Sequence, residues 1–249
     1  LPAERPSAVF VTRYQRWSTE VREHLFPGLG YVPVLGEPLL PVFPKYASSI
    51  HGGLFKRTKD KGLQPLSSLL SQRETKHFIF YQEATRYWTK ATQGLPYYSR
   101  NGAVGAPPHG RYLYFSDTST VHGASAVLNS SLFYLYFIAH GDCFHLSDGL
   151  VASFPVGDWI SSDERLAELN KRLMKDLREK ADKTTINTKD GDRITYAEFQ
   201  GARSKDIIDE IDRVLAKHYG FTEEELDFII NYDIKYRMGQ ESGEDEEEP

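Results

Sequence analysis

The most apolar part of the chain is the stretch HGASAVLNSSLFYLYFIAH, from His122 to His140. Apolar residues fall on more than one side of its helical wheel, which predicts one helix that is mostly buried. Its longest apolar block, from Ser131 to His140, is too short to cross a bilayer, since a spanning helix needs about 20 apolar residues. Because 40% of the chain is hydrophobic and 13% is aromatic, there is enough apolar side-chain material to form a core.

Helical patterns dominate the second half of the chain. In SSDERLAELNKRLMKDLREKAD the leucines follow a spacing of three or four residues, and Ser162 stands where an N-cap is expected. SKDIIDEIDRVLAKHYG repeats the pattern and ends at Gly220, in the position of a C-cap glycine. Thr222 and Glu225 then have the spacing of a capping box, which predicts a third helix.

Strand patterns dominate the first half. Strands are predicted in SAVFVTRYQRW, HFIFYQEA, GRYLYFSD and, further along, SDGLVASFPV, and a short helix is predicted near LSSLLSQ. These patterns predict an α+β fold, with a mixed sheet that carries a cationic loop face and is packed by helices, plus a helical C-terminal part. We expect an α/β region at 1–157, a C-terminal helical region at 158–240 and a disordered acidic tail at 241–249.

The net charge of −5 hides a strong asymmetry along the chain. Residues 45–120 contain eleven Lys and Arg against four Asp and Glu, a net of +7, whereas residues 158–249 contain fifteen against twenty-five, a net of −10. A clustered positive field is typical of a protein that binds a polyanion such as nucleic acid. The alternative is that these are ordinary solvated charges on the surface.

Signals for catalysis are weak. No phosphate-binding loop and no G-x-G-x-x-G follows a strand, so the sequence predicts no cofactor in this chain. Cys143 could be a nucleophile with His145 nearby, and His140, Asp142 and His145 could be read as metal ligands. The Cys143–His145 spacing is expected by chance, however, and a buried structural cysteine is the favoured interpretation. We therefore predict neither a catalytic residue nor a metal site. A nuclease site built on Asp60, Glu74 and Lys76 is a further alternative, although such triplets are common by chance.

The single cysteine excludes an internal disulfide, and the N-terminal sequence shows no signal-peptide pattern. We therefore expect a cytoplasmic protein without a membrane partner.

The informative region is cationic, aromatic and rich in glycine and proline, from YQEATRYWTKATQGLPYYSR through NGAVGAPPHGRYLYF. Lys and Arg neutralise phosphates, Arg, Asn and His reach base edges, and aromatic rings stack on bases. We expect Trp88, Phe78 and Phe80 to fill the core, whereas Arg100, Asn101, His109 and Arg111 are favoured as contacts with a partner. The candidate DNA contacts are Lys45, Lys56, Arg57, Lys59, Arg73, Lys76, Arg86, Lys90, Tyr97, Tyr98, Arg100, Asn101, His109 and Arg111.

Three long phrases resemble a known family. FIFYQEATRYWTKATQGLPYY, VLNSSLFYLYFIAHGDCFHL and SKDIIDEIDRVLAKHYGFTEEELDFIINYDIKYRMG resemble the C-terminal part of the large Eco57I-like and TaqI-like N6-adenine DNA methyltransferases of bacterial restriction-modification and phage-defence systems. In that family this part is the target recognition domain, which reads the DNA site while a catalytic domain methylates a flipped adenine with S-adenosylmethionine.

The resemblance implies a function and also departs from the family. The Asn/Asp-Pro-Pro-Tyr/Phe motif and the glycine-rich cofactor motif of the family are absent, because GAPPHG and GLPYY do not match them. The resemblance therefore implies sequence-specific binding of double-stranded DNA by residues 1–157, with S-adenosylmethionine bound by a separate N-terminal methyltransferase catalytic domain or subunit. The alternatives are a protein–protein adaptor of a defence complex, which would use the acidic C-terminal helices, and the metal-dependent nuclease fragment.

Overall fold

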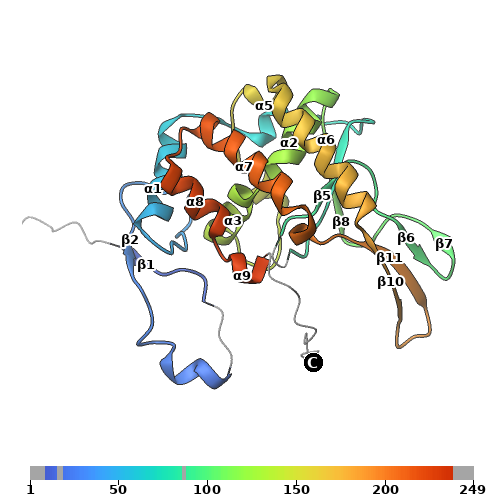
Figure 1. Ribbon diagram of the computed structural model, residues 1–249, viewed down its shortest axis with the longest axis horizontal. Coiled ribbons are helices and arrows are strands. Elements are labelled where there is room, and N and C mark those ends of the chain that lie inside the picture. The colour runs from blue at the N-terminus through green and yellow to red at the C-terminus, as the bar shows by residue number, and fades with distance from the viewer. Residues whose placement is uncertain (1–8, 16–18, 86–87, 238–249) are drawn as a thin grey trace, which may run out of the picture.

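A computed structural model describes residues 9–15, 19–85 and 88–237 (Figure 1). The fold class is α+β, as expected. The helices are η1 (Thr19–His24), α1 (Ser49–Asp60), η2 (Leu66–Leu69), α2 (Thr118–Leu128), α3 (Ser131–His140), α4 (Asp148–Ala152), α5 (Trp159–Ser162), α6 (Glu164–Glu179), η3 (Gly201–Ser204), α7 (Lys205–Tyr219), α8 (Glu223–Asn231) and α9 (Ile234–Arg237). The strands are β1 (Phe10–Val11), β2 (Val32–Pro33), β3 (Gln64–Pro65), β4 (Phe78–Gln82), β5 (Ala91–Thr92), β6 (Tyr98–Arg100), β7 (Ala103–Val104), β8 (Gly110–Tyr114), β9 (Pro155–Val156), β10 (Asp182–Asn187) and β11 (Arg193–Glu198).

The apolar block forms the centre of the core. All ten residues of α3 are buried, and α2, α7 and α8 pack against this helix. The prediction of one helix over 122–140 is wrong, because the chain is extended at Ser130 between α2 and α3. Asn129 stabilises this break, since its side chain pairs with both the N–H (3.1 Å) and the carbonyl (2.7 Å) of Ala91 on β5. No helix in the described part of the chain is both long and apolar enough to span a membrane.

The expected single mixed sheet is wrong. The described strands form four small sheets, in the orders β1-β2, β3-β9, β5-β4-β8 and β10-β11-β6-β7, and every pairing is antiparallel. The central sheet β5-β4-β8 was predicted at β4 and β8, where Leu113 and Phe115 face the core and Tyr112 is exposed. Of the three rings expected to fill the core, Trp88 and Phe80 are buried and Phe78 is half-buried.

Several local predictions were wrong in type or extent. The strand predicted in SDGLVASFPV is mostly the helix α4 followed by the two-residue strand β9, and the strand near the N-terminus is only β1. The predicted short helix in LSSLLSQ is the 3-10 turn η2, and α1 was not predicted. The region predicted to be helical from 158 to 240 contains the long hairpin β10–β11. The predicted acidic tail, 241–249, lies outside the described residues.

The helix ends follow the sequence closely, with one exception. Gly220 caps α7 in the left-handed conformation, with φ of 70°, and Thr222 and Glu225 form the predicted capping box of α8. The N-cap of α6 is Asp163 and not Ser162. The Asp163 carboxylate accepts from the N–H of Leu166 (2.8 Å) and also bonds the ring of His218 on α7 (2.6 Å), so it joins the start of α6 to the end of α7.

A buried charged cluster connects α3, α7 and α9. The Asp212 carboxylate accepts from the N–H groups of Ser131 and Leu132, at the start of α3, each at 3.2 Å. The Arg237 guanidinium donates to the Ser131 hydroxyl (2.9 Å) and lies over the ring of Tyr134, 4.5 Å from its centroid. Burial raises the pKa of Asp212 to about 6, and the N–H donors and the Arg237 charge oppose that rise. Three phrases of the sequence, NSSLFY, IIDEID and NYDIKYR, therefore meet in one structural cluster.

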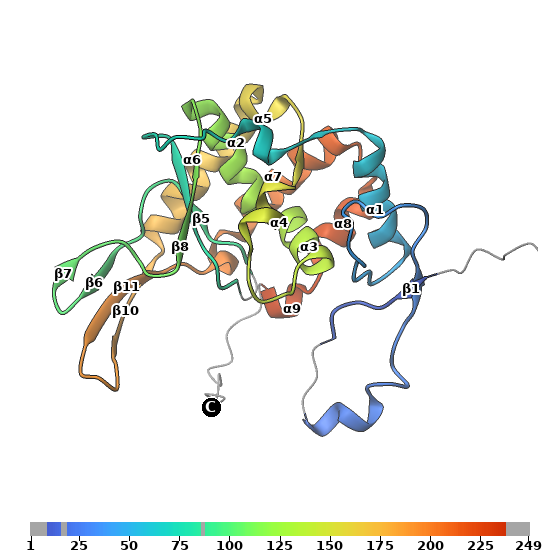
Figure 2. The same ribbon diagram turned by 180° about the vertical axis from the view of Figure 1, so that it is seen from behind.

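Two parts of the chain extend from opposite ends of the helical body. The four-stranded sheet β10-β11-β6-β7 projects from one end, and the segment from β1 to β2, with η1, projects from the other (Figures 1 and 2). We call the four-stranded sheet the arm. Its strand β6 belongs to the predicted region 1–157, whereas β10 and β11 belong to the predicted region 158–240.

Candidate nucleic-acid interface

The arm is built from two hairpins, β10–β11 and β6–β7, which are joined by the pairing of the inner strands β11 and β6. Tyr98 pairs with Tyr196 and Arg100 with Ile194 across that inner pair. The turn between β6 and β7 is Asn101-Gly102, with φ of 53° and 86° at these two positions. Positive φ at both positions is the geometry of the tight hairpin turn that Asn-Gly favours. The dipeptide therefore explains why the glycine-rich loop begins with a hairpin.

The tips of the two hairpins are tied together by Asp192. Its carboxylate accepts from Nε of Arg100 (2.8 Å) and from the side-chain amide of Asn101 (2.6 Å). The backbone of Arg193 completes the connection, because its N–H donates to the Asn101 side chain and its carbonyl accepts from the Asn101 N–H, both at 2.8 Å. The hydrogen bond from Arg100, followed by that from Asn101, lowers the pKa of Asp192. Two of the four residues favoured as contacts with a partner, Arg100 and Asn101, thus hold the tip in shape.

The predicted cations of the central sheet and of the segment before it differ in whether they have carboxylate partners. Arg111, on β8, lies 3.2 Å from Glu83 and 3.7 Å from Asp148. These charges raise the pKa of the Arg111 guanidinium, with Asp148 the larger contribution. His109 is exposed, with φ of 56°. Arg73 and Lys76 are exposed in the segment before β4 and make no ion pair within the described part of the chain.

The aromatic candidates lie at the base of the arm. Tyr97 is 42% exposed, and the ammonium group of Lys183 lies over its ring, 4.6 Å from the ring centroid. Tyr98 is half-buried on β6. Lys90 is half-buried before β5, and Arg86 lies outside the described residues.

The cations of α1 form a separate group. Lys56 pairs with Asp60 at 2.6 Å, within the helix. Arg57 reaches Glu225 on α8, at 3.4 Å, and Lys59 reaches Glu37, at 2.8 Å. The partners of these cations include residues far away in the sequence, so the net charge of a segment overstates the field at its surface.

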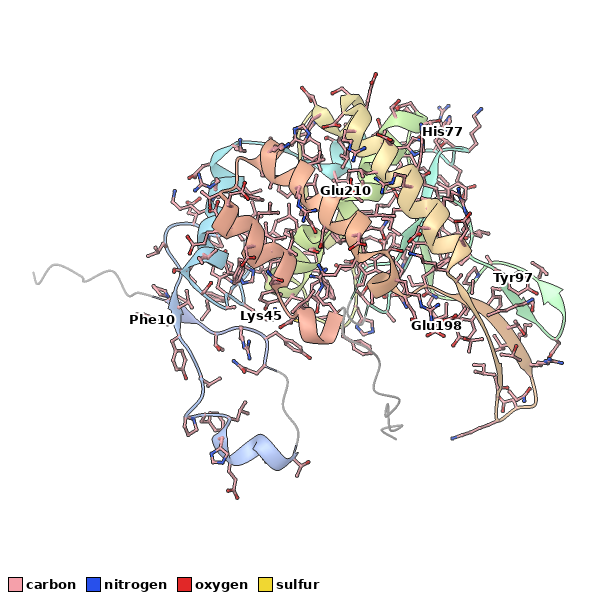
Figure 3. The ribbon with its side chains drawn as sticks, viewed as in Figure 1. Phe10, Lys45, His77, Tyr97, Glu198 and Glu210 are labelled. Carbon is pink, nitrogen blue, oxygen red and sulfur yellow. The ribbon has the colours of Figure 1, made fainter. Side chains whose placement is uncertain are left out.

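The predicted contacts therefore do not form one surface. Lys45, whose ammonium group donates to the Gly141 carbonyl after α3, lies at the side of the molecule away from Tyr97 (Figure 3). Among the candidates that the structure describes, those from Tyr97 to Asn101 lie on or beside the arm. The structure brings together these residues of the loop and leaves α1 on the other side of the body (Figures 1 and 3).

Sequence reasoning missed the second hairpin and its cations. Lys183, Lys189 and Arg193 are exposed on β10, on the turn and on β11, and their side chains make no ion pair within the described residues. The sequence signal for this hairpin was the turn TKDGD, which lies between two runs of alternating residues. Gly191, in that turn, has φ of 88°. These residues belong to the segment with a net charge of −10, which directed attention away from them.

The catalytic alternatives are placed as follows. Cys143 is buried and its thiol donates to the Ile138 carbonyl at 3.4 Å, whereas His145 is exposed and lies 3.2 Å from Asp142. His140 is buried in the core, whereas Asp142 and His145 are exposed. No group of three or more His, Cys, Asp or Glu suited to a metal ion occurs among the described residues.

The proposed nuclease triplet is also dispersed. Asp60 ends α1 and pairs with Lys56. His77, which directly follows Lys76, lies at the opposite side of the molecule from α1 (Figures 1 and 3).

Comparison with protein-family models, curated proteins and solved structures found no match to this chain. The likeness to adenine methyltransferases therefore depends on the sequence phrases quoted above.

Proposed function

We propose that the chain binds double-stranded DNA in a sequence-specific manner, as the target recognition domain of an N6-adenine DNA methyltransferase. The observation that carries the proposal, beside the family resemblance, is the arm. It projects from the body, its tip is tied by Asp192, and its outer hairpin carries three cations that form no ion pair within the described residues. The catalytic domain would bind S-adenosylmethionine and supply the methyl transfer.

The shape of the arm suits a DNA groove. The major groove admits a two-stranded β-ribbon, and proteins of several kinds read bases with strands placed in it. Lys189 lies in the β10–β11 turn and Arg193 directly follows that turn, so both are near the leading end of such a ribbon. A tip that is already ordered before binding avoids part of the entropy cost of docking.

The roles of the predicted residues change accordingly. Arg100 and Asn101 act first through the shape of the tip, because their polar groups are already bound to the hairpin that carries Asp192 and Arg193. Lys189 and Arg193 are the side chains free to contact phosphates or bases. The cations of α1 would contribute little, since each has a carboxylate partner.

The salt dependence of DNA binding tests the proposal. The double variant Lys189→Ala/Arg193→Ala is compared with Arg213→Ala/Lys217→Ala, which removes two exposed cations of α7 that make no ion pair within the described residues. Fluorescence anisotropy of a labelled duplex is measured from 50 to 300 mM salt. Each lost phosphate contact lowers the slope of log K against log salt by about 0.9, so the arm variant should lose up to about 2 units of slope and the α7 variant none.

Two results would contradict the proposal. If the unmodified chain shows no duplex binding at low salt, DNA is not the partner. If both double variants lose the same affinity, binding follows overall charge and not the arm. Selection of bound sites from a random duplex pool then tests specificity. Asn101→Gly keeps the turn but removes the side-chain bonds to Asp192 and to the Arg193 N–H, so it should reduce the sequence preference of the selected sites.

A second candidate is the adaptor, which one observation favours. Of the fourteen large hydrophobic residues that are exposed in the described part of the chain, eight lie between residues 9 and 43, including Phe26 and Phe43 at 78% and 76% exposure. Exposed apolar surface on that scale is typical of a protein–protein interface. Mixing the chain with a candidate partner subunit and measuring the complex by analytical ultracentrifugation, with and without Phe26→Ser and Phe43→Ser, tests this candidate.

A further inference from the structure

A pocket of about 260 Å³ lies at the base of the arm. It is bounded by the segment 92–97, by the C-terminal part of α6 and by β11 and the residue after it. Met174, Leu177 and Phe199 form buried apolar parts of its wall. Leu95 and Tyr97 lie on the exposed side, with Tyr97 presenting part of its ring.

The charge of the pocket has one sign. Among the described residues that line it, Arg178 is the only charged one, and no carboxylate is present. Arg178 is exposed and makes no ion pair within the described part of the chain. Lys183 adds a second positive charge beside the pocket, because its ammonium group lies over the Tyr97 ring.

We propose that this pocket receives one nucleotide that is swung out of the DNA bound by the arm, with its base against the apolar wall and its phosphate near Arg178 and Lys183. The inference rests on the proposed function and adds a site to it. The base and the phosphate account for different features of the pocket. The apolar wall offers a base contact area, and Tyr97 supplies an aromatic ring, one face of which carries Lys183. A phosphate beside it would be neutralised by the two cations.

The size and charge distinguish this occupant from others. The volume is below the range of about 300 to 1,000 Å³ that is common for ligand sites, which suits a single planar ring system better than a folded peptide segment. An apolar side chain of a protein partner would fill the pocket but would carry no negative charge for Arg178 and Lys183 to neutralise.

A bulged duplex provides the probe. One duplex carries a single unpaired adenine and its control lacks it, so the first offers a base that is already unpaired and costs less to extrude. Stacking a base on an aromatic side chain is worth enough to change affinity about five- to tenfold or more. The unmodified chain should therefore bind the bulged duplex about tenfold more tightly than the perfect duplex in fluorescence anisotropy.

Two variants locate that preference. Ala197→Phe fills the pocket from β11, and Arg178→Ala removes its charge. Both should reduce the preference for the bulged duplex to about onefold to threefold, while affinity for the perfect duplex changes little. Arg213→Ala on α7 is the matched control and should keep the full preference. If Ala197→Phe has a lowered melting temperature, Leu95→Ala, which trims an exposed wall residue, replaces it.

The outcomes separate this inference from the proposed function. Perfect-duplex binding without a bulge preference, or with a preference that survives both variants, overturns the pocket site and leaves DNA binding in place. Absence of duplex binding overturns the proposed function and this inference with it. Saturable binding of free dAMP at micromolar concentration, without a bulge preference, would assign the pocket to a free nucleotide and overturn the extrusion of a base from DNA.

Discussion

Lowering the pH from 7 to 5 should remove about 4 kcal/mol from the free energy of unfolding through two buried histidines, His51 and His140. His51 is fully buried on α1, where its Nδ1 accepts from the N–H of Ala47 at 3.2 Å and its Nε2 has no partner among the described residues. Burial, followed by the nearby charge of His140, lowers the pKa of His51 to about 3.

His140 is in a similar position at the end of α3. Burial lowers its pKa to about 4, the hydrogen bond to the Tyr136 carbonyl opposes this, and the charge of Lys45 adds to it. Both folded-state pKa values are below the value of about 6.5 expected in the unfolded chain. The unfolded state therefore takes up protons first as the pH falls, so stability is complete above about pH 6.5 and decreases toward the folded-state pKa values.

The size of the stability loss depends on how far pH 5 lies below the unfolded-state pKa of about 6.5. That pH is about 1.5 units below the unfolded value, and one unit corresponds to about 1.4 kcal/mol, so each histidine contributes about 2 kcal/mol. Asp212 acts in the opposite direction, because its pKa is raised to about 6 and protonation favours the folded state by about 1 kcal/mol at pH 5. The net loss from the three groups is about 3 kcal/mol, a large part of the 5 to 15 kcal/mol typical of a domain.

Urea denaturation at pH 7, 6 and 5 measures this loss, with His51→Asn as the diagnostic variant. Asparagine keeps an acceptor for the Ala47 N–H and removes the titrating ring, so the variant should lose about 2 kcal/mol less than the parent between pH 7 and pH 5. His109→Asn is the control, since His109 is exposed and asparagine tolerates its positive φ. An identical pH dependence in His51→Asn and in the parent would refute the reasoning.

Three further predictions concern stability and are read by urea denaturation at pH 7. Asp212→Ala should cost about 3 to 5 kcal/mol, because it leaves two helix N–H groups without their acceptor and removes the negative charge that favours the buried Arg237 guanidinium, whereas Asp209→Ala, in a half-buried pair with Lys205, should cost about 1 kcal/mol or less. Gly123→Ala should be severely destabilising, because its new methyl group would lie 1.8 Å from a backbone oxygen of α5, and Gly149→Ala, which meets no atom within 4 Å, should be close to neutral. Thr222→Ala should cost about 1 kcal/mol through loss of the capping box of α8, and an unchanged stability would show that the cap is replaced by solvent.

The sequence was most informative where a structure is determined by neighbouring residues. The C-cap at Gly220 and the capping box of Thr222 and Glu225 each depend on a few consecutive residues, and both were predicted. The strands β4 and β8 were also predicted, since both are short runs of aromatic and apolar residues; on β4 the three consecutive residues Ile79, Phe80 and Tyr81 are all buried. The N-cap of α6 was misplaced by one residue because Ser162 and Asp163 are both good caps and a distant histidine favours the second.

Elements that depend on distant partners were missed. The helix α1 contains Gly52 and Gly53, which weaken an isolated helix by about 1 kcal/mol each relative to alanine. The ring of Tyr46 packs against Gly52, where an added methyl group would lie only 3.3 Å from it, and Leu54 and Phe55 are buried below. Tertiary packing therefore supports a helix that its composition does not predict.

The charge of a segment was a poor guide to the charge of a surface. The segment 45–120 has a net charge of +7, yet the structure supplies Glu37, Glu225, Asp192 and Asp148 to its cations from outside that segment. Cations of the acidic C-terminal half, on β10 and β11, are exposed without ion pairs in the described part of the chain. The fold decides which charges face a partner. The sequence determines that arrangement only through contacts between residues that are far apart along the chain.

Two of the three phrases that carry the family resemblance lie away from the proposed DNA contacts of the arm. The phrases NSSLFY, IIDEID and NYDIKYR meet at Ser131, Asp212 and Arg237, where every group is buried and none can reach DNA. The arm, in contrast, is mostly surface, and it contributes no residue to that cluster. If the proposed function holds, the buried cluster fixes the scaffold and the arm sequence sets the site. Exchanging residues 183–190 and residue 193 for other residues, with Gly191 and Asp192 kept, should then change the selected DNA site while the unfolding free energy stays within about 1 kcal/mol of the parent. A large loss of stability with an unchanged site would place recognition elsewhere on the molecule.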